Sequence, residues 1–131
     1  MRNHWPGWEI KRVLTGMRVL VVDDEAIIVM LIKTFLKNGG CEVVGTATCL
    51  QDALEKARSL PIDVALLDIN LAGKMSYPVA EVLQSRNLPF AFVTGYSTAK
   101  LPSGLRTTPM LTKPFQQDQL FKILHDATGS R

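Results

Sequence analysis

Four polar residues, three aspartates and a lysine, stand at the ends of short apolar runs that lie far apart in the 131-residue sequence. Asp23 and Asp24 follow the first of these runs, and Asp68 follows the third. Lys113 follows the last. If the runs are parallel strands of one sheet, their carboxyl ends share one edge, where open α/β folds bind their ligands. Three carboxylates and one ammonium at that edge would form a pocket for a divalent cation and a phosphoryl group.

The adjacent pair Asp23-Asp24 is the strongest indication of a cation site. Neighbouring carboxylates repel one another, whereas Mg²⁺ prefers oxygen ligands and keeps several waters in protein sites. The alternative is a solvated acidic turn or a helix N-terminus, where the helix dipole favours negative charge. Glu25, the next residue, fits that alternative. The pair alone leaves both interpretations open, and the metal hypothesis depends on Asp68 joining it.

Asp68 has the chemistry of a nucleophile, because a carboxylate can attack a phosphoryl group to form an acyl phosphate. The transition state of this transfer mainly needs charge neutralisation and alignment. Mg²⁺ would neutralise charge on one side of the phosphoryl group. Lys113, which is followed by Pro114, would neutralise charge on the other side. The alternatives are an aspartate that caps a helix and a lysine whose ammonium reaches solvent.

Thr94 and Gly95 follow a further apolar run, residues 90–93, and would lie at the same edge. By itself Thr94 is an ordinary β-former that closes a strand. Beside Asp68 and Lys113, however, its hydroxyl would lie within reach of a phosphoryl oxygen. Gly95 would expose its backbone N–H at the same place.

From Met17 onwards, the apolar periodicity predicts strands that alternate with helices. Short β-branched and leucine-rich runs indicate buried strands, and apolar residues at i, i+3, i+4 and i+7 indicate helices packed on a sheet. The alternation predicts an α/β fold with a doubly wound five-stranded parallel sheet. The predicted strands are 19–22, 42–45, 63–67, 90–93 and 110–112; the predicted helices are 26–37, one capped by Thr48 and reaching Ala57, one beginning near Pro78, and one around 120–127.

The segment 97–108 departs from this pattern. A helix is expected there, but the segment contains Pro102, Gly104 and two successive threonines. Proline costs about 3 kcal/mol and glycine about 1 kcal/mol in a helix interior. We therefore predict a fourth helix that is short, irregular or mobile. Residues 70–76, which include Gly73, are predicted to form a loop.

Four sequence blocks occur in order along the chain: Val21-Val22-Asp23-Asp24-Glu25, Leu66-Leu67-Asp68-Ile69-Asn70-Leu71, Val93-Thr94-Gly95-Tyr96 and Leu111-Thr112-Lys113-Pro114-Phe115. Together they resemble the signature blocks of response-regulator receiver domains, the phosphoaccepting modules of two-component signalling. The resemblance extends over about residues 17–127, nearly the whole chain, and four motifs in the right order make it specific. It implies the flavodoxin-like receiver fold.

The resemblance implies a metal site around the phosphoacceptor. Asp68 would be the phosphoacceptor, Asp24 a direct Mg²⁺ ligand, and Asp23 a ligand acting through water. Asp68 would itself contact the ion, and Asn70 would offer its backbone carbonyl. These roles follow from the motif positions and not from the spacing alone.

The resemblance also implies that Thr94 contacts the phosphoryl group, that Lys113 pairs with it, and that the bond before Pro114 is cis. Receivers usually carry Tyr or Phe three residues before the lysine, where this chain has Met110. Tyr96 instead follows Thr94 closely, as in a receiver subfamily with a Phe-X-Thr-Gly-Tyr-type motif. We therefore predict that Tyr96 and the segment after it carry the switch, in place of the usual threonine and aromatic pair.

Composition excludes several classes of protein. The chain is 47% apolar and 21% charged with a net charge of +3, which indicates one globular domain. Residues 1–16 hold two of the three excess positive charges, so the folded body has no basic stripe for nucleic acid. No apolar run reaches the roughly 20 residues that cross a bilayer, and the N-terminus lacks a signal-peptide layout. Cys41 and Cys49 have no metal-like spacing and are interpreted as reduced thiols of a cytoplasmic protein.

Two domain regions are predicted. Residues 1–16, with Trp5-Pro6-Gly7-Trp8, are interpreted as a poorly ordered N-terminal extension, or alternatively as a docking arm that uses its two tryptophans. Residues 17–131 form the receiver domain. No residues are left after Arg131 for an output domain, so we expect a stand-alone receiver.

The predicted function is that of a phosphoprotein in a two-component phosphorelay. A histidine kinase, a phosphotransfer protein or a small acyl phosphate would phosphorylate Asp68 with Mg²⁺ present. The modified state would then act through protein contacts on an unknown downstream protein, at the face around the fourth helix and the fifth strand. A weak homodimer is left open.

The sequence leaves two alternatives to this function. A degenerate receiver that is never phosphorylated would act only as a binding module. A phosphatase of the haloacid-dehalogenase kind also uses an aspartyl phosphate, but it would carry Asp-X-Asp where this chain has Asp23-Asp24-Glu25. The chain is therefore not expected to be an enzyme beyond catalysing its own phosphorylation and dephosphorylation.

Overall fold

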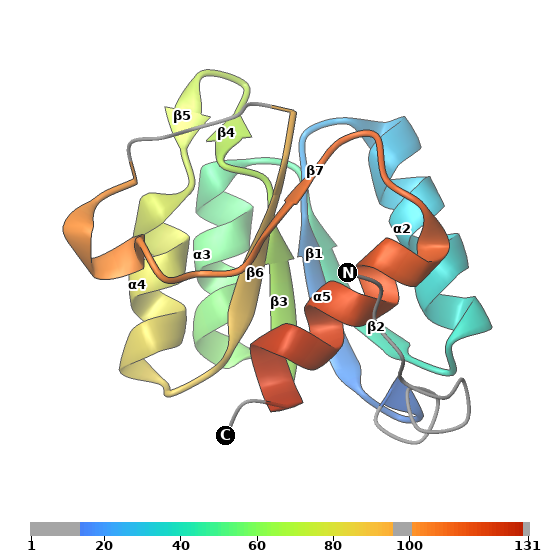
Figure 1. Ribbon diagram of the computed structural model, residues 1–131. Helices are drawn as coiled ribbons and strands as arrows, with labels where there is room; N and C mark the ends of the chain where they lie inside the picture. The colour runs from blue at the N-terminus through green and yellow to red at the C-terminus, as the bar shows by residue number, and fades with distance from the viewer. Residues whose placement is uncertain (1–13, 96–100, 130–131) are drawn as a thin grey trace.

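The computed structural model of the chain describes residues 14–95 and 101–129. Strands and helices alternate along the chain, and a central sheet separates two layers of helices (Figure 1). The elements are β1 (Arg18–Val22), α2 (Ala26–Asn38), β2 (Glu42–Ala47), α3 (Leu50–Ser59), β3 (Val64–Leu67), β4 (Asn70–Leu71), β5 (Lys74–Met75), α4 (Tyr77–Ser85), β6 (Phe90–Thr94), the 3₁₀ turn η1 (Ser103–Leu105), β7 (Met110–Thr112) and α5 (Gln117–Gly129).

Five strands form one parallel sheet in the order β2-β1-β3-β6-β7. The chain runs outward from β1 to β2, crosses back to β3 and continues through β6 to β7. This order confirms the predicted doubly wound α/β fold. Because every strand runs in the same direction, all five carboxyl ends lie at one edge, the upper edge in Figure 1. The short pair β4-β5 stands at that edge as a separate antiparallel hairpin.

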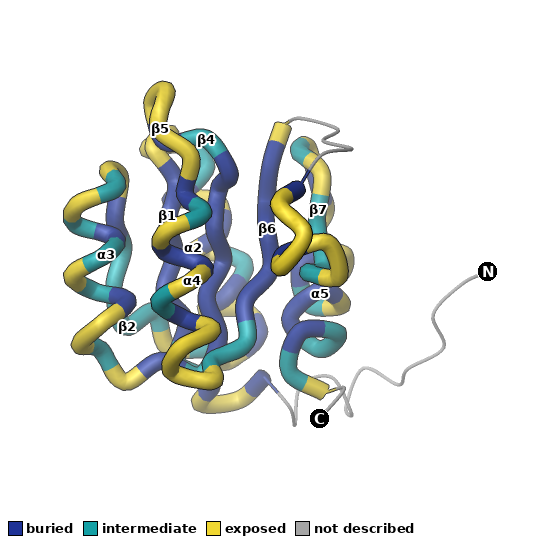
Figure 2. Tube along the Cα trace, turned by 90° about the vertical axis from the view of Figure 1, so that its left-hand side faces the viewer, coloured by how far each residue is buried: buried dark blue, intermediate teal, exposed yellow. Residues whose placement is uncertain are grey.

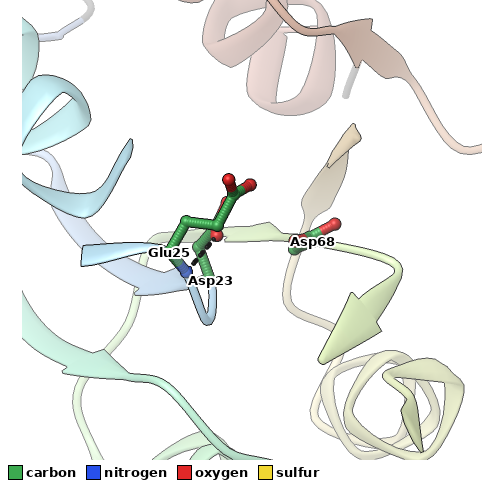
Figure 3. A group of neighbouring side chains, drawn as sticks. All are labelled: Asp23, Glu25 and Asp68. Atoms are coloured by element: carbon green, nitrogen blue, oxygen red, sulfur yellow. Dashed lines mark hydrogen bonds between the residues drawn. The ribbon is translucent and has the colours of Figure 1, made fainter. Parts of the chain in front are cut away.

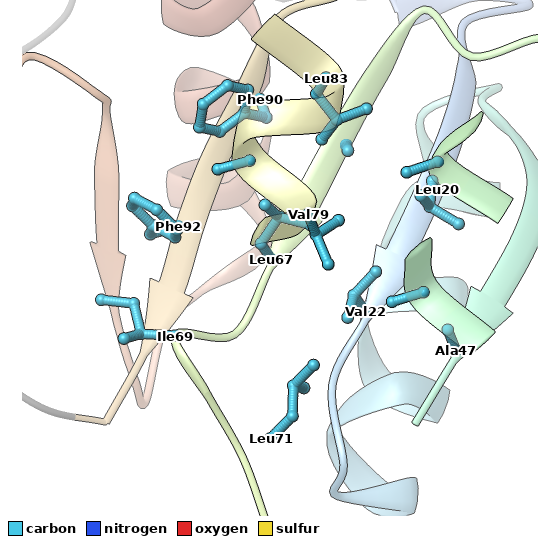
Figure 4. Packing of buried hydrophobic residues seen from close by; sticks show 14 of the residues in the cluster. Leu20, Val22, Ala47, Leu67, Ile69, Leu71, Val79, Leu83, Phe90 and Phe92 are labelled. Atoms are coloured by element: carbon cyan, nitrogen blue, oxygen red, sulfur yellow. The ribbon is translucent and has the colours of Figure 1, made fainter. Parts of the chain in front are cut away.

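Successive residues of the central strands face opposite helix layers. In β1, Leu20 and Val22 belong to the apolar cluster beneath α3 and α4, shown in Figure 4. Val19 and Val21 belong to the cluster beneath α2 and α5. Both faces of the sheet are therefore covered, which explains why its strands read as continuous apolar runs and not as alternating ones. In Figure 2 the central strands β1, β3 and β6 are mostly buried and the edge strands β2 and β7 are mostly intermediate, whereas the helices expose their outer sides.

The connection between β6 and β7 contains only the turn η1 in its described part, since residues 96–100 lie outside it. Leu101 and Leu105 are buried in the cluster beneath α3 and α4. Gln84 Nε2 of α4 donates a hydrogen bond of 3.0 Å to the carbonyl oxygen of Gly104. The predicted short, irregular fourth helix is confirmed for this part, where the two buried leucines and the hydrogen bond from Gln84 attach the segment to α4 and the cluster beneath it.

The segment after β3, predicted to be a loop, is instead the β4-β5 hairpin, so that prediction was wrong. Ala72 and Gly73 form its turn with positive φ angles of 52° and 95°. The backbone N–H of Gly73 donates to Asn70 Oδ1 at 2.6 Å, and the N–H of Ser76 donates to the carbonyl of Ile69 at 2.7 Å. These two hydrogen bonds stabilise a hairpin whose strands are too short to show strand periodicity in the sequence.

The predicted N-cap of α3 was also wrong. Thr48 is not the N-cap of α3; Cys49 holds that position in an extended conformation without a side-chain cap hydrogen bond. Leu14 is fully buried in the cluster beneath α2 and α5, so the packed body begins before Met17. Residues 1–13 of the predicted extension, with both tryptophans, lie outside the described residues. Cys41 and Cys49 are free thiols.

The described helices, within residues 14–95 and 101–129, have at most 13 residues each, fewer than the roughly 20 that cross a bilayer. None of them is both long enough and apolar enough to cross a membrane.

Candidate functional site

The carboxyl edge of the sheet brings three of the predicted residues into contact. Asp23 follows β1, Asp68 follows β3, and Lys113 follows β7. Lys113 Nζ lies 2.8 Å from Asp23 Oδ2 and 3.4 Å from Asp68 Oδ2. The side chains of the two aspartates are 1% and 7% exposed, and that of the lysine is 11% exposed. The sheet topology thus gathers residues from distant positions into one nearly buried charge cluster.

A pocket of about 600 Å³ opens beside this cluster. The start of α2 forms one wall and the β4-β5 hairpin forms another. Asp24 is exposed at the rim, and Asn70 lies on the hairpin wall with its side-chain oxygen engaged by the turn. The lining residues are Asp24, Glu25, Asp68, Asn70, Ala72, Gly73, Gly95 and Lys113.

Glu25 joins the cluster, although the sequence favoured a simple helix-start role for it. Its backbone N–H donates to Asp23 Oδ1 at 2.8 Å (Figure 3), and its Oε1 lies 3.0 Å from Lys113 Nζ. One carboxylate oxygen each from Asp23, Glu25 and Asp68 lies within 4.8 Å of the others. Glu25 does precede α2 directly, so the helix-start interpretation was incomplete. Its place directly after the acidic pair was the one sequence signal for this second role.

The cluster shifts the acidity of its members. Burial raises the pKa of Asp68 to about 6, and the nearby negative charge of Asp23 adds to the rise despite the opposing effect of Lys113. Burial alone would lower the pKa of Lys113, but its close contacts with the carboxylates of Asp23 and Glu25 outweigh burial and raise the pKa. The lysine therefore stays charged, while Asp68 lies close to its titration range at neutral pH.

The donor set fits a hard divalent cation. Carboxylate oxygens are the ligands that Mg²⁺ and Ca²⁺ prefer. Asp23 Oδ2 is buried and has no hydrogen-bond partner among the described residues, and its contact with Lys113 is an ion pair. A buried carboxylate oxygen normally has such a partner. The cluster of Asp23, Glu25 and Asp68 could therefore hold a metal ion.

Thr94 and Met110, which the sequence also assigned to the site, lie on β6 and β7. Thr94 ends β6, is fully buried, and its carbonyl accepts the N–H of Lys113 at 2.8 Å. Met110 starts β7 and packs, partly buried, against the cluster beneath α3 and α4. The bond between Lys113 and Pro114 is cis, as the resemblance implied. Tyr96 lies outside the described residues.

Residues 19–125 match the response regulator receiver domain. This chain belongs to that family. The sensory transduction protein LytT of Bacillus cereus is 30% identical to this receiver over 112 residues, which cover 82% of the chain but 46% of LytT. The chain thus spans about half the length of this curated relative.

Solved receiver structures show the same fold. SdrG from Sphingomonas melonis Fr1 is 40% identical, with a TM-score of 0.75, and the match covers 83% of this chain and 93% of SdrG. The response regulator PhyR from Brucella abortus is 30% identical, with a TM-score of 0.80, and the match covers 95% of this chain and 52% of PhyR. The receiver fold and its place in two-component signalling, predicted from the four motifs, are confirmed.

Proposed function

We propose that this receiver accepts one phosphoryl group on Asp68. The observation that best supports the proposal is the contact of the buried Asp68 with Lys113, 3.4 Å apart at the side of the pocket. In the reaction, an Asp68 carboxylate oxygen forms a bond to phosphorus while the bond between phosphorus and the donor breaks. The leaving group keeps the electron pair of that bond. The Lys113 ammonium then offsets the charge on the phosphoryl oxygens.

The acidic residues would hold Mg²⁺ for this transfer. Following the family pattern, we assign Asp24 as a direct ligand and Asp23 as a ligand through water. Asp68 and the backbone carbonyl of Asn70 would be the other two Mg²⁺ ligands from the protein. When bound, the ion would neutralise charge on the phosphoryl oxygens and on the carboxylates. Glu25 is not one of these assigned ligands, although its carboxylate belongs to the acidic cluster.

Incubation of the protein with acetyl phosphate and Mg²⁺, followed by intact-mass analysis, tests the proposal. The mass should increase by one phosphoryl group, and EDTA should prevent the increase. A protein that stays at its original mass under both conditions would instead be a binding module that is not phosphorylated. Phosphate release faster than the protein's own phosphorylation and dephosphorylation would instead indicate a phosphatase.

The phosphodonor is proposed to be a histidine kinase or a phosphotransfer protein that docks on α2. Three large apolar side chains on this helix are exposed: Ile27, Met30 and Leu31, at 79%, 67% and 36%. Their spacing of three and four residues places them on one side of the helix. Ile27 lies two residues after the pocket-lining Glu25. Because a donor must reach Asp68 in this pocket, its surface would cover the adjacent apolar face.

Substituting this face should slow transfer from a protein donor without affecting a small one. We expect Ile27→Ser with Met30→Ser to reduce the phosphorylation rate by a donor protein at least about tenfold, since buried anchors in an interface each contribute on the order of 1 kcal/mol or more. Acetyl phosphate should phosphorylate the variant at the wild-type rate. Glu81→Ser, on the exposed side of α4, is the surface control. Equal slowing with both donors would contradict docking on α2.

Downstream signalling is proposed to proceed through protein contacts around η1 and β7. Met110 occupies the β7 position where receivers usually carry an aromatic switch residue, and it packs with Leu105 in one cluster. A phosphoryl-dependent shift of this segment would change the surface that a partner meets. Tyr96 is proposed to take part; replacing it by Ala should then abolish phosphorylation-dependent partner binding.

A further inference from the structure

Glu25 has no part in the proposed transfer, yet it is one of the closest partners of Lys113. Lys113 Nζ lies 2.8 Å from Asp23 Oδ2 and 3.0 Å from Glu25 Oε1. Its distance to Asp68 Oδ2 is longer, 3.4 Å. The proposed phosphoacceptor is therefore the most distant of the three carboxylates around this ammonium. Of the three, the Glu25 side chain is also the most exposed, at 60%.

Three carboxylates surround the Lys113 ammonium: its N–H groups donate to Glu25 Oε1 and Asp68 Oδ2, and Asp23 pairs with it by charge. A phosphoryl group on Asp68 would bring further oxygens to the same ammonium. These oxygens would compete with the present carboxylates for the ammonium. Asp23 is nearly fully buried and its Oδ1 is held by a backbone N–H at 2.8 Å. Glu25 is the partner that can withdraw, because its side chain reaches the pocket from the solvent side.

We propose that Glu25 is a positioning residue that holds Lys113 and competes with the phosphoryl group for it. The inference rests on the proposed function, because the competition requires a phosphoryl group on Asp68. Before transfer, Glu25 keeps the ammonium near the rim of the pocket. After transfer, Lys113 contacts the phosphoryl oxygens and Glu25 moves into solvent. The contact between Glu25 and Lys113 thus opposes phosphorylation.

Two substitutions separate this contact from the effect of charge alone. Glu25→Gln removes the negative charge from the rim of the pocket. Glu25→Asp keeps the charge but is shorter by one methylene group, so its carboxylate is drawn back from Lys113. Glu81→Gln, which removes an exposed carboxylate from α4 away from the lining residues of the pocket, is the matched control.

The probe is BeF₃⁻ with Mg²⁺, which mimics a phosphoryl group on a carboxylate without reacting further. SdrG, 39% identical to this chain in that structure, has been solved in a BeF₃-activated conformation. Affinity for BeF₃⁻ at saturating Mg²⁺ is measured by calorimetry for each variant. Mg²⁺ affinity without BeF₃⁻ is measured in parallel, and circular dichroism establishes that each variant is folded.

Both Glu25→Gln and Glu25→Asp should bind BeF₃⁻ about two- to fivefold more tightly than the wild type, the range for a largely exposed ion pair. Saturating Mg²⁺ keeps any change in Mg²⁺ affinity out of this comparison, and Glu81→Gln should match the wild type throughout. BeF₃⁻ affinity of Glu25→Asp that is unchanged or weaker would overturn the proposal, whatever Glu25→Gln does. A wild type that binds no BeF₃⁻ would refute the proposed function itself.

Discussion

The Asp68→Asn variant will keep its unmodified mass after incubation with acetyl phosphate and Mg²⁺, whereas the wild-type protein gains one phosphoryl group. The amide has almost the same shape as the carboxylate, but it lacks the negative charge and the nucleophilic oxygen that the transfer needs. The loss should be complete, because Asp68 is the buried carboxylate that faces both Lys113 and the pocket. Intact-mass analysis measures both proteins in the same experiment.

Asp52→Asn is the matched control for this loss. Asp52 pairs with Lys56 on α3 in a partly buried ion pair of 2.8 Å, outside the pocket. It should therefore become phosphorylated like the wild type. A phosphoryl group on Asp68→Asn would show that another side chain is the acceptor, and the assignment of Asp68 would then be wrong.

The second large effect concerns stability and its dependence on pH. The folded protein raises the pKa of Asp68 to about 6, above the value of about 3.9 for an exposed aspartate. The folded state therefore holds this proton more strongly than the unfolded chain does. The contribution of Asp68 to the free energy of unfolding is greatest at low pH and is lost as the pH rises through about 4 to 6. Ionised Asp68 thus destabilises the fold at neutral pH.

Asp68→Asn should remove this penalty. The difference in unfolding free energy between variant and wild type should grow by about 2 kcal/mol from about pH 4.5 to about pH 8, since a shift of one pKa unit corresponds to about 1.4 kcal/mol. Urea denaturation in EDTA at several pH values measures it, and comparing the two proteins cancels the groups they share. A difference that does not change with pH would contradict the raised pKa.

The sheet and the meeting of Asp23, Asp68 and Lys113 were predictable for one physical reason. A strand covered on both faces must be apolar throughout, so a charged residue marks where the strand leaves the core. Parallel strands then place all such residues at the same edge. Because this logic depends only on strand ends, it did not require knowledge of the helices or loops.

The features that the sequence did not reveal depend on contacts between short or polar segments. The β4-β5 hairpin has strands of two residues each, too short for periodicity, and the side chain of Asn70 helps to hold its turn. Leu14 lies in a stretch without clear apolar periodicity, so the sequence did not predict its burial against α2 and α5. Glu25 was assigned to the helix start because an acidic residue is favourable there, whether or not a lysine is nearby.

Titration of the ¹⁵N-labelled protein with Mg²⁺, followed through its backbone amide signals, tests most directly whether this edge of the sheet is a metal-dependent phosphoryl site. We predict saturable changes centred on Asp24, Asp68 and Asn70, with Asp24→Asn weakening the binding strongly. The amides around Asp63, whose ion pair with Arg18 lies at the opposite edge of the sheet, should stay unchanged. The absence of any saturable change, or changes centred on Asp63, would contradict the account.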